Sequence, residues 1–277
     1  MKRKLGEMFD LTSRVAIITG GTGLLGQQHA EAIASAGGIP VLADIHIDGV
    51  DPKSREWEER FGVSASVIHA DVTRPDSVEQ LLACVLEKYG RIDVLINNAA
   101  NNPKMEKESD IRFSRVEFFP LDQWEADIAV GLTGAFLCCQ IIGSEMARRR
   151  RGVIVNVASD LALIAPDQRL YRKEGVADDQ QPVKPVTYSV VKTALIGLTR
   201  YLAAYWADCG VRVNAISPGG VFNGQPEQFV RRLTSLIPLG RMANVDEYQA
   251  AIIYLCSDAS SYMTGANLVV DGGRTCW

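Results

Sequence analysis

The chain has 277 residues, of which 47% are apolar and 22% are charged, an ordinary composition for a globular protein with a full core. Its net charge of -4 gives no reason to expect a nucleic acid or an anionic membrane as partner. No apolar run approaches the ~20 residues that span a bilayer, and the basic N-terminus lacks the apolar stretch of a signal peptide, so we expect a cytoplasmic protein without a membrane segment.

The cysteines and histidines are scattered along the chain. The six cysteines show no CxxC spacing and the three histidines stand alone, which argues against zinc and against a disulfide framework. We therefore expect no metal site, a reducing compartment, and a packing role for most of the cysteines.

A glycine-rich turn follows the first predicted strand. An apolar run at 14–19 enters the turn at 20–26, and a helical pattern continues to about residue 36. In this context glycines let backbone N–H groups approach a pyrophosphate at the helix N-terminus. Both G-x-G-x-x-G, from Gly21 to Gly26, and T-G-x-x-G-x-x-G, from Thr19 to Gly26, are present. A tight turn also needs glycine, but the placement after a strand favours a dinucleotide.

An acidic residue ends the second predicted strand. That strand covers 39–43 and reaches Asp44, about 18 residues after Gly26. A carboxylate near this spacing accepts hydrogen bonds from an adenosine ribose and would repel a 2′-phosphate. Neither Arg nor Lys stands in the glycine turn or directly after Asp44, so the sequence favours NAD over NADP. The alternative is a carboxylate that caps the following turn.

Strands and helices alternate through the rest of the chain. Further strands are expected at 66–70, 92–96, 153–157, 212–216 and 267–270, and helices at 75–89, 123–148, 187–207 and 246–256. This alternation predicts an α/β fold in which helices cover both faces of a parallel sheet. We find no internal repeat or linker and expect one domain over residues 1–277. Polar connections at 101–120, 160–187 and 222–237 are expected to be substrate loops.

A tyrosine and a lysine stand four residues apart in the predicted helix 187–207. Tyr188 and Lys192 therefore share a helix face. A fixed ammonium favours the phenolate of a tyrosine whose pKa is ordinarily near ~10, so the pair could act as acid or base near neutrality. A shift of about three units needs roughly 4 kcal/mol, to be shared between the lysine and a cofactor charge. The alternative is a Tyr–Lys pair on a solvated face.

Several stretches together carry a family resemblance. They are the glycine turn at 19–26, Asp71-Val72, Asn97-Asn-Ala-Ala100, Ser159, the Tyr188–Lys192 pair, Pro218-Gly219 and the segment 265–273. In this order they resemble the short-chain dehydrogenase/reductase family over nearly the whole chain. The resemblance implies a Rossmann-type sheet of about seven strands, a nicotinamide cofactor, hydride transfer between an alcohol and a carbonyl, and a homodimer or homotetramer.

The resemblance also implies roles for particular residues. Tyr188 would exchange a proton with the substrate oxygen, Lys192 would hold the nicotinamide ribose and lower the tyrosine pKa, and Ser159 would hydrogen-bond the same substrate oxygen. Besides Tyr188 and Lys192, the implied cofactor contacts are Gly20, Thr22, Leu25 and Gly26 at the pyrophosphate and ribose, Asp44 at the adenosine ribose, Asp71 and Val72 at the adenine, Asn98 and Ala99 along the cofactor wall, and Pro218, Gly219 and Val221 at the nicotinamide.

Three features depart from the family pattern. Leu24 replaces a glycine of the T-G-x-x-x-G-x-G spacing in the compact branch, so the turn looks like that of the extended branch, many of whose members act on nucleotide sugars. Gly131 stands where the family has an asparagine that supports a water in a proton relay. The gap between Ser159 and Tyr188 is far longer than the dozen or so residues usual in the family.

The substrate and two alternative functions stay open. The loops suggest a polar sugar, including a phosphorylated or nucleotide-linked one, bound by Arg169 and Arg172; the alternative is that their cations are solvated. The cations are Lys104, Arg112, Arg115, Arg169, Arg172 and Lys173. A cofactor-binding sensor or scaffold is supported only by Gly131 and opposed by the retained Ser159, Tyr188 and Lys192. A 3-oxoacyl-thioester reductase would prefer NADPH, which Asp44 disfavours.

Overall fold

The computed structural model describes residues 4–47, 51–101 and 114–277. Lys104, Arg112 and most of the expected substrate loop 101–120 lie outside these residues.

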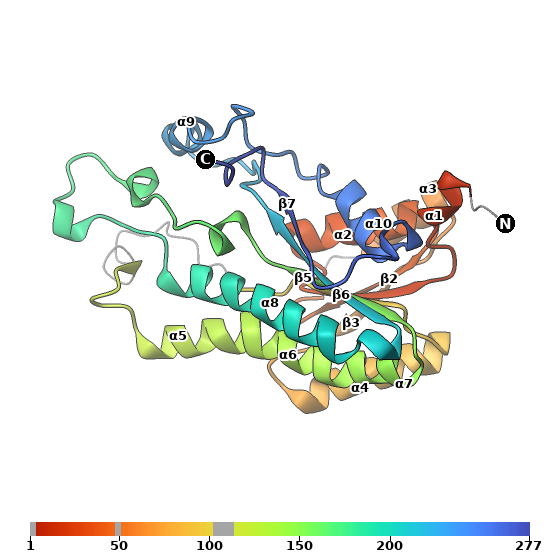
Figure 1. Cartoon of the computed structure of the whole chain (residues 1–277). Coiled ribbons are helices and arrows are strands. Elements are labelled where there is room, and N and C mark those ends of the chain that lie inside the picture. The colour runs from red at the N-terminus through yellow and green to blue at the C-terminus, as the bar shows by residue number, and fades with distance from the viewer. Residues whose placement is uncertain (1–3, 48–50, 102–113) are drawn as a thin grey trace.

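Seven parallel strands form one sheet in the order β3-β2-β1-β4-β5-β6-β7 (Figure 1). The strands are β1 Val15–Thr19, β2 Ile39–Asp44, β3 Ser66–His69, β4 Val94–Asn97, β5 Gly152–Val157, β6 Val211–Pro218 and β7 Asn267–Val270. The chain runs outward from β1 to β3 and then returns to β4 on the other side of β1. This change of direction opens a crevice beyond the carboxyl ends of β1 and β4, where ligands bind in such sheets. The predicted α/β fold is confirmed.

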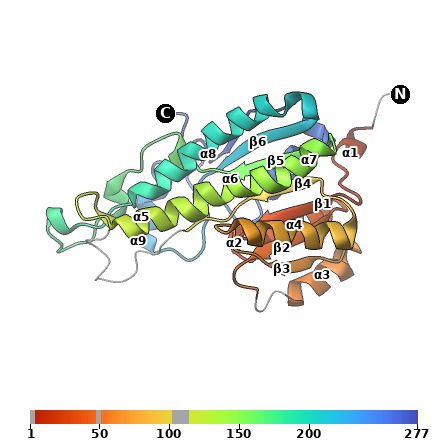
Figure 2. The ribbon, with the colours of Figure 1, turned by 90° about the horizontal axis from the view of Figure 1, so that it is seen from below.

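Helices cover both faces of the sheet (Figure 1). They are α1 Leu5–Met8, α2 Leu24–Ser35, α3 Asp51–Phe61, α4 Pro75–Tyr89, α5 Leu121–Ile128, α6 Gly134–Cys138, α7 Ser144–Arg148, α8 Val186–Tyr205, α9 Glu227–Thr234 and α10 Gln249–Cys256. Two π-helical segments, η3 Ala129–Thr133 and η4 Cys139–Gly143, join α5, α6 and α7 into one rod. Figure 2 shows this rod beside α8, and residues of α5 and η3 contact that helix.

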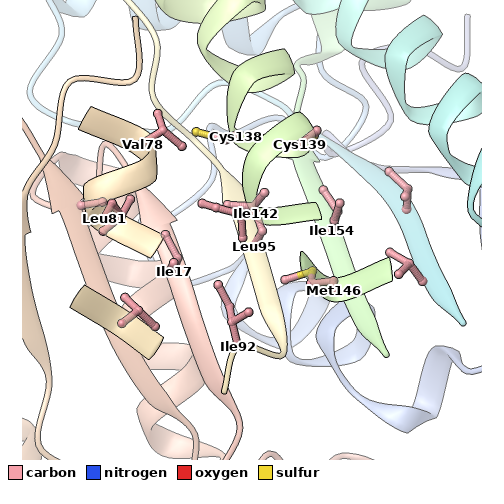
Figure 3. Packing of buried hydrophobic residues seen from close by; sticks show 14 of the residues in the cluster. Ile17, Val78, Leu81, Ile92, Leu95, Cys138, Cys139, Ile142, Met146 and Ile154 are labelled. Atoms are coloured by element: carbon pink, nitrogen blue, oxygen red, sulfur yellow. The ribbon is translucent and has the colours of Figure 1, made fainter. Parts of the chain in front are cut away.

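Two hydrophobic clusters lie on opposite faces of the sheet, because successive side chains of a strand point to opposite sides. Ile17 of β1 packs with Leu95, Ile142 and Met146 beneath α4 and the rod (Figure 3). Ile18, the next residue, packs in the other cluster with residues of α2 and α10. Continuous apolar runs in the strands are therefore buried on both sides, as expected for a parallel sheet.

The rod Leu121–Arg148 is long and apolar enough to cross a membrane by length and composition alone. The expectation that no apolar run approaches a membrane-spanning length is thus wrong for this helix, although the core helix of a soluble protein passes the same test. In this structure its side chains Cys138, Ile142 and Met146 are fully buried between the rod and the sheet. Packing against the core therefore accounts for its apolar face.

Candidate active site

The glycine turn is fastened to the end of β4. Thr19 Oγ1 accepts hydrogen bonds from the backbone N–H groups of Asn98 and Ala99, both at 3.1 Å. The side-chain amide of Asn98 donates to the carbonyl oxygens of Thr19 and Gly20 at 3.1 and 3.0 Å. Gly20 itself has a φ of +61°, which favours glycine. Asn98 and Ala99 therefore help to hold the turn at the crevice.

No side chain fits at two positions of the turn. A Cβ at Gly20 would lie 2.9 Å from Ala99 Cα, and one at Gly26 would overlap the carbonyl oxygen of Gly20. The turn leads into α2, whose N-cap is Gly23 and whose first residue is Leu24. The N-terminus of this helix presents backbone N–H groups that suit a phosphate. The turn thus fits the pyrophosphate of a dinucleotide.

Asp44 lies at the end of β2 and contacts the glycine turn. Its Oδ2 accepts hydrogen bonds from the Thr22 backbone N–H at 3.1 Å and from Thr22 Oγ1 at 2.7 Å. Its Oδ1 accepts from the backbone N–H of His46 at 3.0 Å. The alternative named for Asp44, a carboxylate that caps the turn after its strand, is therefore observed. Each carboxylate oxygen can accept more than one hydrogen bond, so the arrangement also leaves the expected ribose contact available.

The other expected cofactor residues lie at neighbouring strand ends. Asp71 follows β3, and its Oδ1 accepts from the backbone N–H and hydroxyl of Thr73. Val72 is buried against the rod at Gly134. At the end of β6, Tyr248 donates to the carbonyl oxygen of Gly219 at 3.0 Å. These contacts leave the expected cofactor segments along one edge of the sheet, because parallel strands end there together.

Val221 lies just beyond Gly219. It forms an isolated bridge with Ala243, and Gln225 donates to its carbonyl oxygen at 2.9 Å. Its backbone is thus fixed directly after the turn that begins at Pro218. The nicotinamide contact expected there stays a prediction.

Ser159, Tyr188 and Lys192 meet at the carboxyl end of β5. Ser159 follows β5, and its hydroxyl lies close enough to Tyr188, in the first turn of α8, to act on the pKa of that tyrosine. One turn later, the Lys192 ammonium donates to the carbonyl oxygen of Val157 at 2.6 Å. Lys192 is only 5% exposed, and its Nζ lies 5.9 Å from the centroid of the Tyr188 ring. The pair therefore lies in an interior site and not on a solvated helix face.

Burial dominates the protonation of this site. Burial raises the pKa of Tyr188, while the nearby Ser159 hydroxyl acts in the opposite direction and the Asp160 carboxylate adds to the rise. Burial, aided by the nearby Lys184 ammonium, lowers the pKa of Lys192 to about 8. In the protein alone the pKa of Tyr188 is therefore raised, because desolvation disfavours the phenolate more than its neighbours favour it. The lowering of this pKa by Lys192 together with a cofactor charge stays a prediction.

The residue after Ser159 orients its hydroxyl. Ser159 Oγ donates to Asp160 Oδ1 at 2.8 Å, and the Leu161 backbone N–H donates to that same oxygen at 2.8 Å. Asp160 is buried, which raises its pKa. The sequence interpretation missed this carboxylate. Its only signal was its position directly after a serine at a strand end.

A small pocket opens beside Tyr188. It is lined by Ala100, Asn101, Asp127, Gly131, Lys184, Pro185, Thr187, Tyr188, Val191 and Lys192. Lys184 Nζ lies 3.9 Å from the centroid of the Tyr188 ring, closer than Lys192. The sequence interpretation also missed Lys184 and Asp127. A signal for Lys184 was present, since Lys184, Tyr188 and Lys192 follow one another at intervals of four.

Gly131 lies in the π-helical segment η3, where α8 crosses close to the rod. A Cβ on this residue would lie 2.6 Å from Val191 Cγ1. Single π-helical turns within α-helices frequently occur at functional sites. The close approach of Val191 explains why no side chain, including the asparagine of the family pattern, stands at this position.

Gly131→Ala is expected to lower the free energy of unfolding by about 1–3 kcal/mol, because the buried Val191 must move to admit the methyl group. Urea unfolding measures the change. The same substitution made in a Val191→Ala background should cost much less, because the opposing methyl groups are gone. An equal cost in both backgrounds would show that the contact is not the cause.

Arg169 and Arg172 lie on the exposed side of the loop 160–187. Arg169 forms a bidentate pair with Asp167, with a shortest distance of 2.7 Å, and the Arg172 guanidinium lies 3.4 Å from Asp178 Oδ1. Neither residue lines the pocket beside Tyr188. The structure therefore does not bring the two arginines to the catalytic group, and it agrees with the alternative that they are solvated loop charges.

The expected substrate loops at 160–187 and 222–237 pack against each other. Leu170 of the first is buried with Leu233 of the second, and the rings of Tyr171 and Phe229 lie 5.6 Å apart. Arg232 donates to the carbonyl oxygen of Arg172 at 2.7 Å. These contacts form a structured wall next to the Ser159–Tyr188 group.

A parallel sheet with a glycine turn at its crevice and a Ser–Tyr–Lys group beside it defines a dinucleotide-dependent oxidoreductase. A family model described as enoyl-(acyl carrier protein) reductase matches residues 23–275. The chain is 34% identical to D-threitol dehydrogenase from Mycolicibacterium smegmatis, covering 96% of this chain and 95% of the relative. It is 32% identical to NAD-dependent glycerol dehydrogenase from Listeria innocua, covering 96% of each.

A solved structure of another oxidoreductase has the same fold. NADPH-dependent 3-quinuclidinone reductase from Rhodotorula rubra superposes with a TM-score of 0.85 at 29% identity, covering 100% of this chain and 97% of that one. The chain belongs to the short-chain dehydrogenase/reductase family. It is an NAD(P)-dependent oxidoreductase that interconverts an alcohol and a carbonyl.

Proposed function

We propose that the protein oxidises a short polyol or a related sugar alcohol, and reduces the corresponding carbonyl, with NAD preferred over NADP. The observation that carries the proposal is the Ser159–Tyr188–Lys192 group at the end of β5, beside the glycine turn. The names of two relatives, a D-threitol and a glycerol dehydrogenase, support a polyhydroxy substrate. The exposed, acid-paired Arg169 and Arg172 do not favour a phosphorylated one.

The glycine turn fits a nicotinamide dinucleotide. A side chain at Gly20 or Gly26 would collide with the backbone of Ala99 or of Gly20, so glycine permits this tight turn. The backbone N–H groups at the start of α2, into which the turn leads, suit a pyrophosphate. Asp44 would hold the adenosine ribose, Asp71 and Val72 would lie at the adenine, and Lys192 would hold the nicotinamide ribose. When bound, the nicotinamide supplies the hydride acceptor for alcohol oxidation and the hydride donor for the reverse reaction.

The side chains of this protein would handle the proton. Tyr188 would take the proton of the substrate hydroxyl during oxidation and return it during reduction. Ser159, oriented by Asp160, would hydrogen-bond the same substrate oxygen. Lys192, fixed by the Val157 carbonyl, would keep a positive charge near the phenol. The loops 160–187 and 222–237 would surround the substrate and exclude water.

The test is turnover on a defined panel. Purified protein is mixed with NAD⁺ or NADP⁺ and with glycerol, D-threitol, mannitol or simple alcohols, while nicotinamide absorbance is followed. An oxoacyl thioester is tested in the reducing direction with NADH or NADPH. We expect the highest kcat/KM with a polyol and NAD⁺. A preference for the thioester with NADPH would favour the acyl-reductase alternative. Cofactor binding without turnover on any substrate would favour the sensor.

Asp44→Ala is expected to reduce kcat/KM with NAD⁺ by about 10- to 100-fold, because hydrogen bonds from the ribose to a charged acceptor are lost. The value with NADP⁺ should fall less or rise, because the repulsion of a 2′-phosphate is also lost. Thr22→Val is the matched control, since it removes the hydroxyl bonded to Asp44 and leaves the carboxylate in place. If both variants keep the wild-type ratio of NAD⁺ to NADP⁺ activity, Asp44 does not select the cofactor.

We also propose a homodimer or homotetramer that assembles through the rod, α8 and the C-terminal segment. Large apolar side chains on the outer surfaces of the rod and α8 support this proposal: Phe136, Val190, Tyr201 and Tyr205 are exposed in the single chain. Sedimentation velocity gives the mass of the assembly, and a monomer at micromolar concentration would contradict it. A cytoplasmic location and a single domain over 1–277 stay predictions.

A further inference from the structure

A second lysine lies against the tyrosine of the proposed catalytic group. Lys184 Nζ is 3.9 Å from the centroid of the Tyr188 ring, whereas Lys192 Nζ is 5.9 Å away. An ammonium within about 6 Å of a ring centroid is attracted by the negative face of the ring. Lys184 is therefore in electrostatic contact with the group that would exchange the substrate proton.

The surrounding residues hold Lys184 in the pocket. Its backbone N–H donates to Gln168 Oε1 at 2.8 Å, and the next residue, Pro185, is the N-cap of α8. Burial lowers the pKa of Lys184 to about 8, and the carboxylates of Asp160 and Asp127 oppose that decrease. Two carboxylates from different elements thus favour a positive charge at this place.

Asp127 is itself fixed. Its Oδ2 accepts from Thr187 Oγ1 at 2.5 Å, and its Oδ1 accepts from Gln123 Nε2 at 2.7 Å. It is buried between the rod and the start of α8. The carboxylate that faces Lys184 therefore belongs to a connected polar network and does not lie on a free surface.

The same pocket contains Gly131, which departs from the family pattern. Val191 occupies the space that a side chain at 131 would need, so this position offers no polar group to the site. Among the residues that the structure describes, Lys184, Asp127 and Lys192 are the ionisable side chains that line the pocket around it together with Tyr188. Position 131 itself therefore gives no polar support, and the charged groups of this pocket are Asp127 of the rod, Lys192 of α8 and Lys184 from the loop before α8.

We propose that Lys184 is a positioning residue for Tyr188, which keeps a positive charge against the tyrosine ring and favours its phenolate form in place of the polar support absent at Gly131. The proposal rests on the proposed function, in which Tyr188 is the acid and base. Lys184 acts through Tyr188 and need not touch the substrate.

The groups that face Tyr188 set the sign of the effect. In the described ranges, they are Lys192 on α8, Lys184 before it, Asp127 on α5, Ser159 and Asp160 after β5, and Tyr171 on the loop. Groups this close titrate as a set, so a proton lost by the set can leave the phenol while an amine keeps its own. Removing the charge of Lys184 leaves fewer positive neighbours, and the phenolate should form only at higher pH.

The first test needs no substrate. The alkaline absorbance change of tyrosine is measured for the wild type, Lys184→Met and Lys184→Arg, each against the same protein carrying Tyr188→Phe, so that the difference isolates Tyr188. We expect the midpoint to rise by about one pH unit in Lys184→Met, equivalent to a tenfold change in the ionisation equilibrium. Lys184→Arg, which keeps the charge, should stay near the wild type. Lys173→Met, an exposed lysine of the same loop, is the matched control.

The second test measures turnover with NAD⁺ and D-threitol. Lys184→Met should lower kcat at pH 7 by about tenfold and move the rising limb of the kcat profile to higher pH, with KM for NAD⁺ unchanged. Lys184→Arg should have a kcat and a pH profile close to those of the wild type. A folded Lys184→Met with an unshifted tyrosine midpoint overturns the proposal. A shifted midpoint without turnover on D-threitol leaves Lys184 supported and counts against the proposed substrate.

Thermal unfolding shows whether each variant is folded. Where Lys184→Met is unstable, Lys184→Gln is used in its place. This variant keeps a polar side chain in the pocket and, like Lys184→Met, compares a neutral residue with the charged lysine of the wild type. A lower kcat in Lys184→Gln with an unshifted midpoint would indicate a structural role only and would also overturn the proposal.

Discussion

Tyr188→Phe is expected to lower kcat by at least about 10³-fold with every alcohol that the wild type oxidises. The substitution removes one oxygen atom and keeps the ring that contacts Lys184 and packs in the pocket. A positioned acid or base contributes typically 10²–10⁴-fold, and no other tyrosine in the described part of the chain lines this pocket. Steady-state absorbance of the reduced nicotinamide measures the loss.

Two measurements separate lost chemistry from lost structure. Tyr201→Phe is the matched control, because Tyr201 lies on the same helix, is 66% exposed, and stacks on Tyr205 away from the pocket. It should retain wild-type kcat. Binding of NAD⁺ to Tyr188→Phe, followed by calorimetry, should change little, because the hydroxyl contributes to the substrate side. Appreciable turnover by a folded, NAD⁺-binding Tyr188→Phe would remove Tyr188 from the proposed role.

Local signals in the sequence were sufficient for much of the fold. The helix predicted at 75–89 has these bounds in the structure, because Pro75 suits its first turn and Gly90, with a φ of +69°, ends it in the left-handed region. The strand at 267–270 also agrees with β7. The π-helical segments of the rod could not be predicted, since they depend on how the rod packs against α8 and carry no local pattern of their own.

The expected site residues meet because the geometry of a parallel sheet brings strand ends together. Thr19, Asn98 and Ser159 belong to three strand ends that are far apart in sequence and adjacent in the sheet. Contacts that helices and loops make with one another above the sheet left no comparable signal in the sequence. Asp127 reaches the pocket from the rod and Lys184 from a loop, and only the three-dimensional packing shows that both face Tyr188.

The direction of the tyrosine pKa shift could not be derived from spacing alone. The interval between Tyr188 and Lys192 predicted a shared face, which the structure has, but burial of the phenol decides the sign. For Arg169 the local sequence did indicate an internal partner, because Asp167 stands two residues earlier and accepts two hydrogen bonds from its guanidinium. An arginine with an adjacent carboxylate is a weaker candidate for an anionic substrate.

Gly26→Ala is expected to lower the free energy of unfolding by about 3 kcal/mol and to weaken NAD⁺ binding by at least about 100-fold. The added methyl group would overlap the carbonyl oxygen of Gly20 and lie 2.8 Å from Gly21 Cα. These are backbone atoms, so no side chain can rotate to make room. The turn must move, and with it the N–H groups that would hold the pyrophosphate. Urea unfolding and calorimetry measure the two effects.

Gly197→Ala is the matched control, because it makes the same change in another helix. A Cβ at Gly197 meets no atom within 4 Å, and the residue lies in the interior of α8. Alanine is the better helix former, so this variant should be more stable than the wild type by roughly 0.5–1 kcal/mol with unchanged NAD⁺ affinity. The contrast depends only on backbone crowding. If Gly26→Ala bound NAD⁺ like the wild type, the glycine turn would not be the pyrophosphate site, and the cofactor position inferred from it would be wrong.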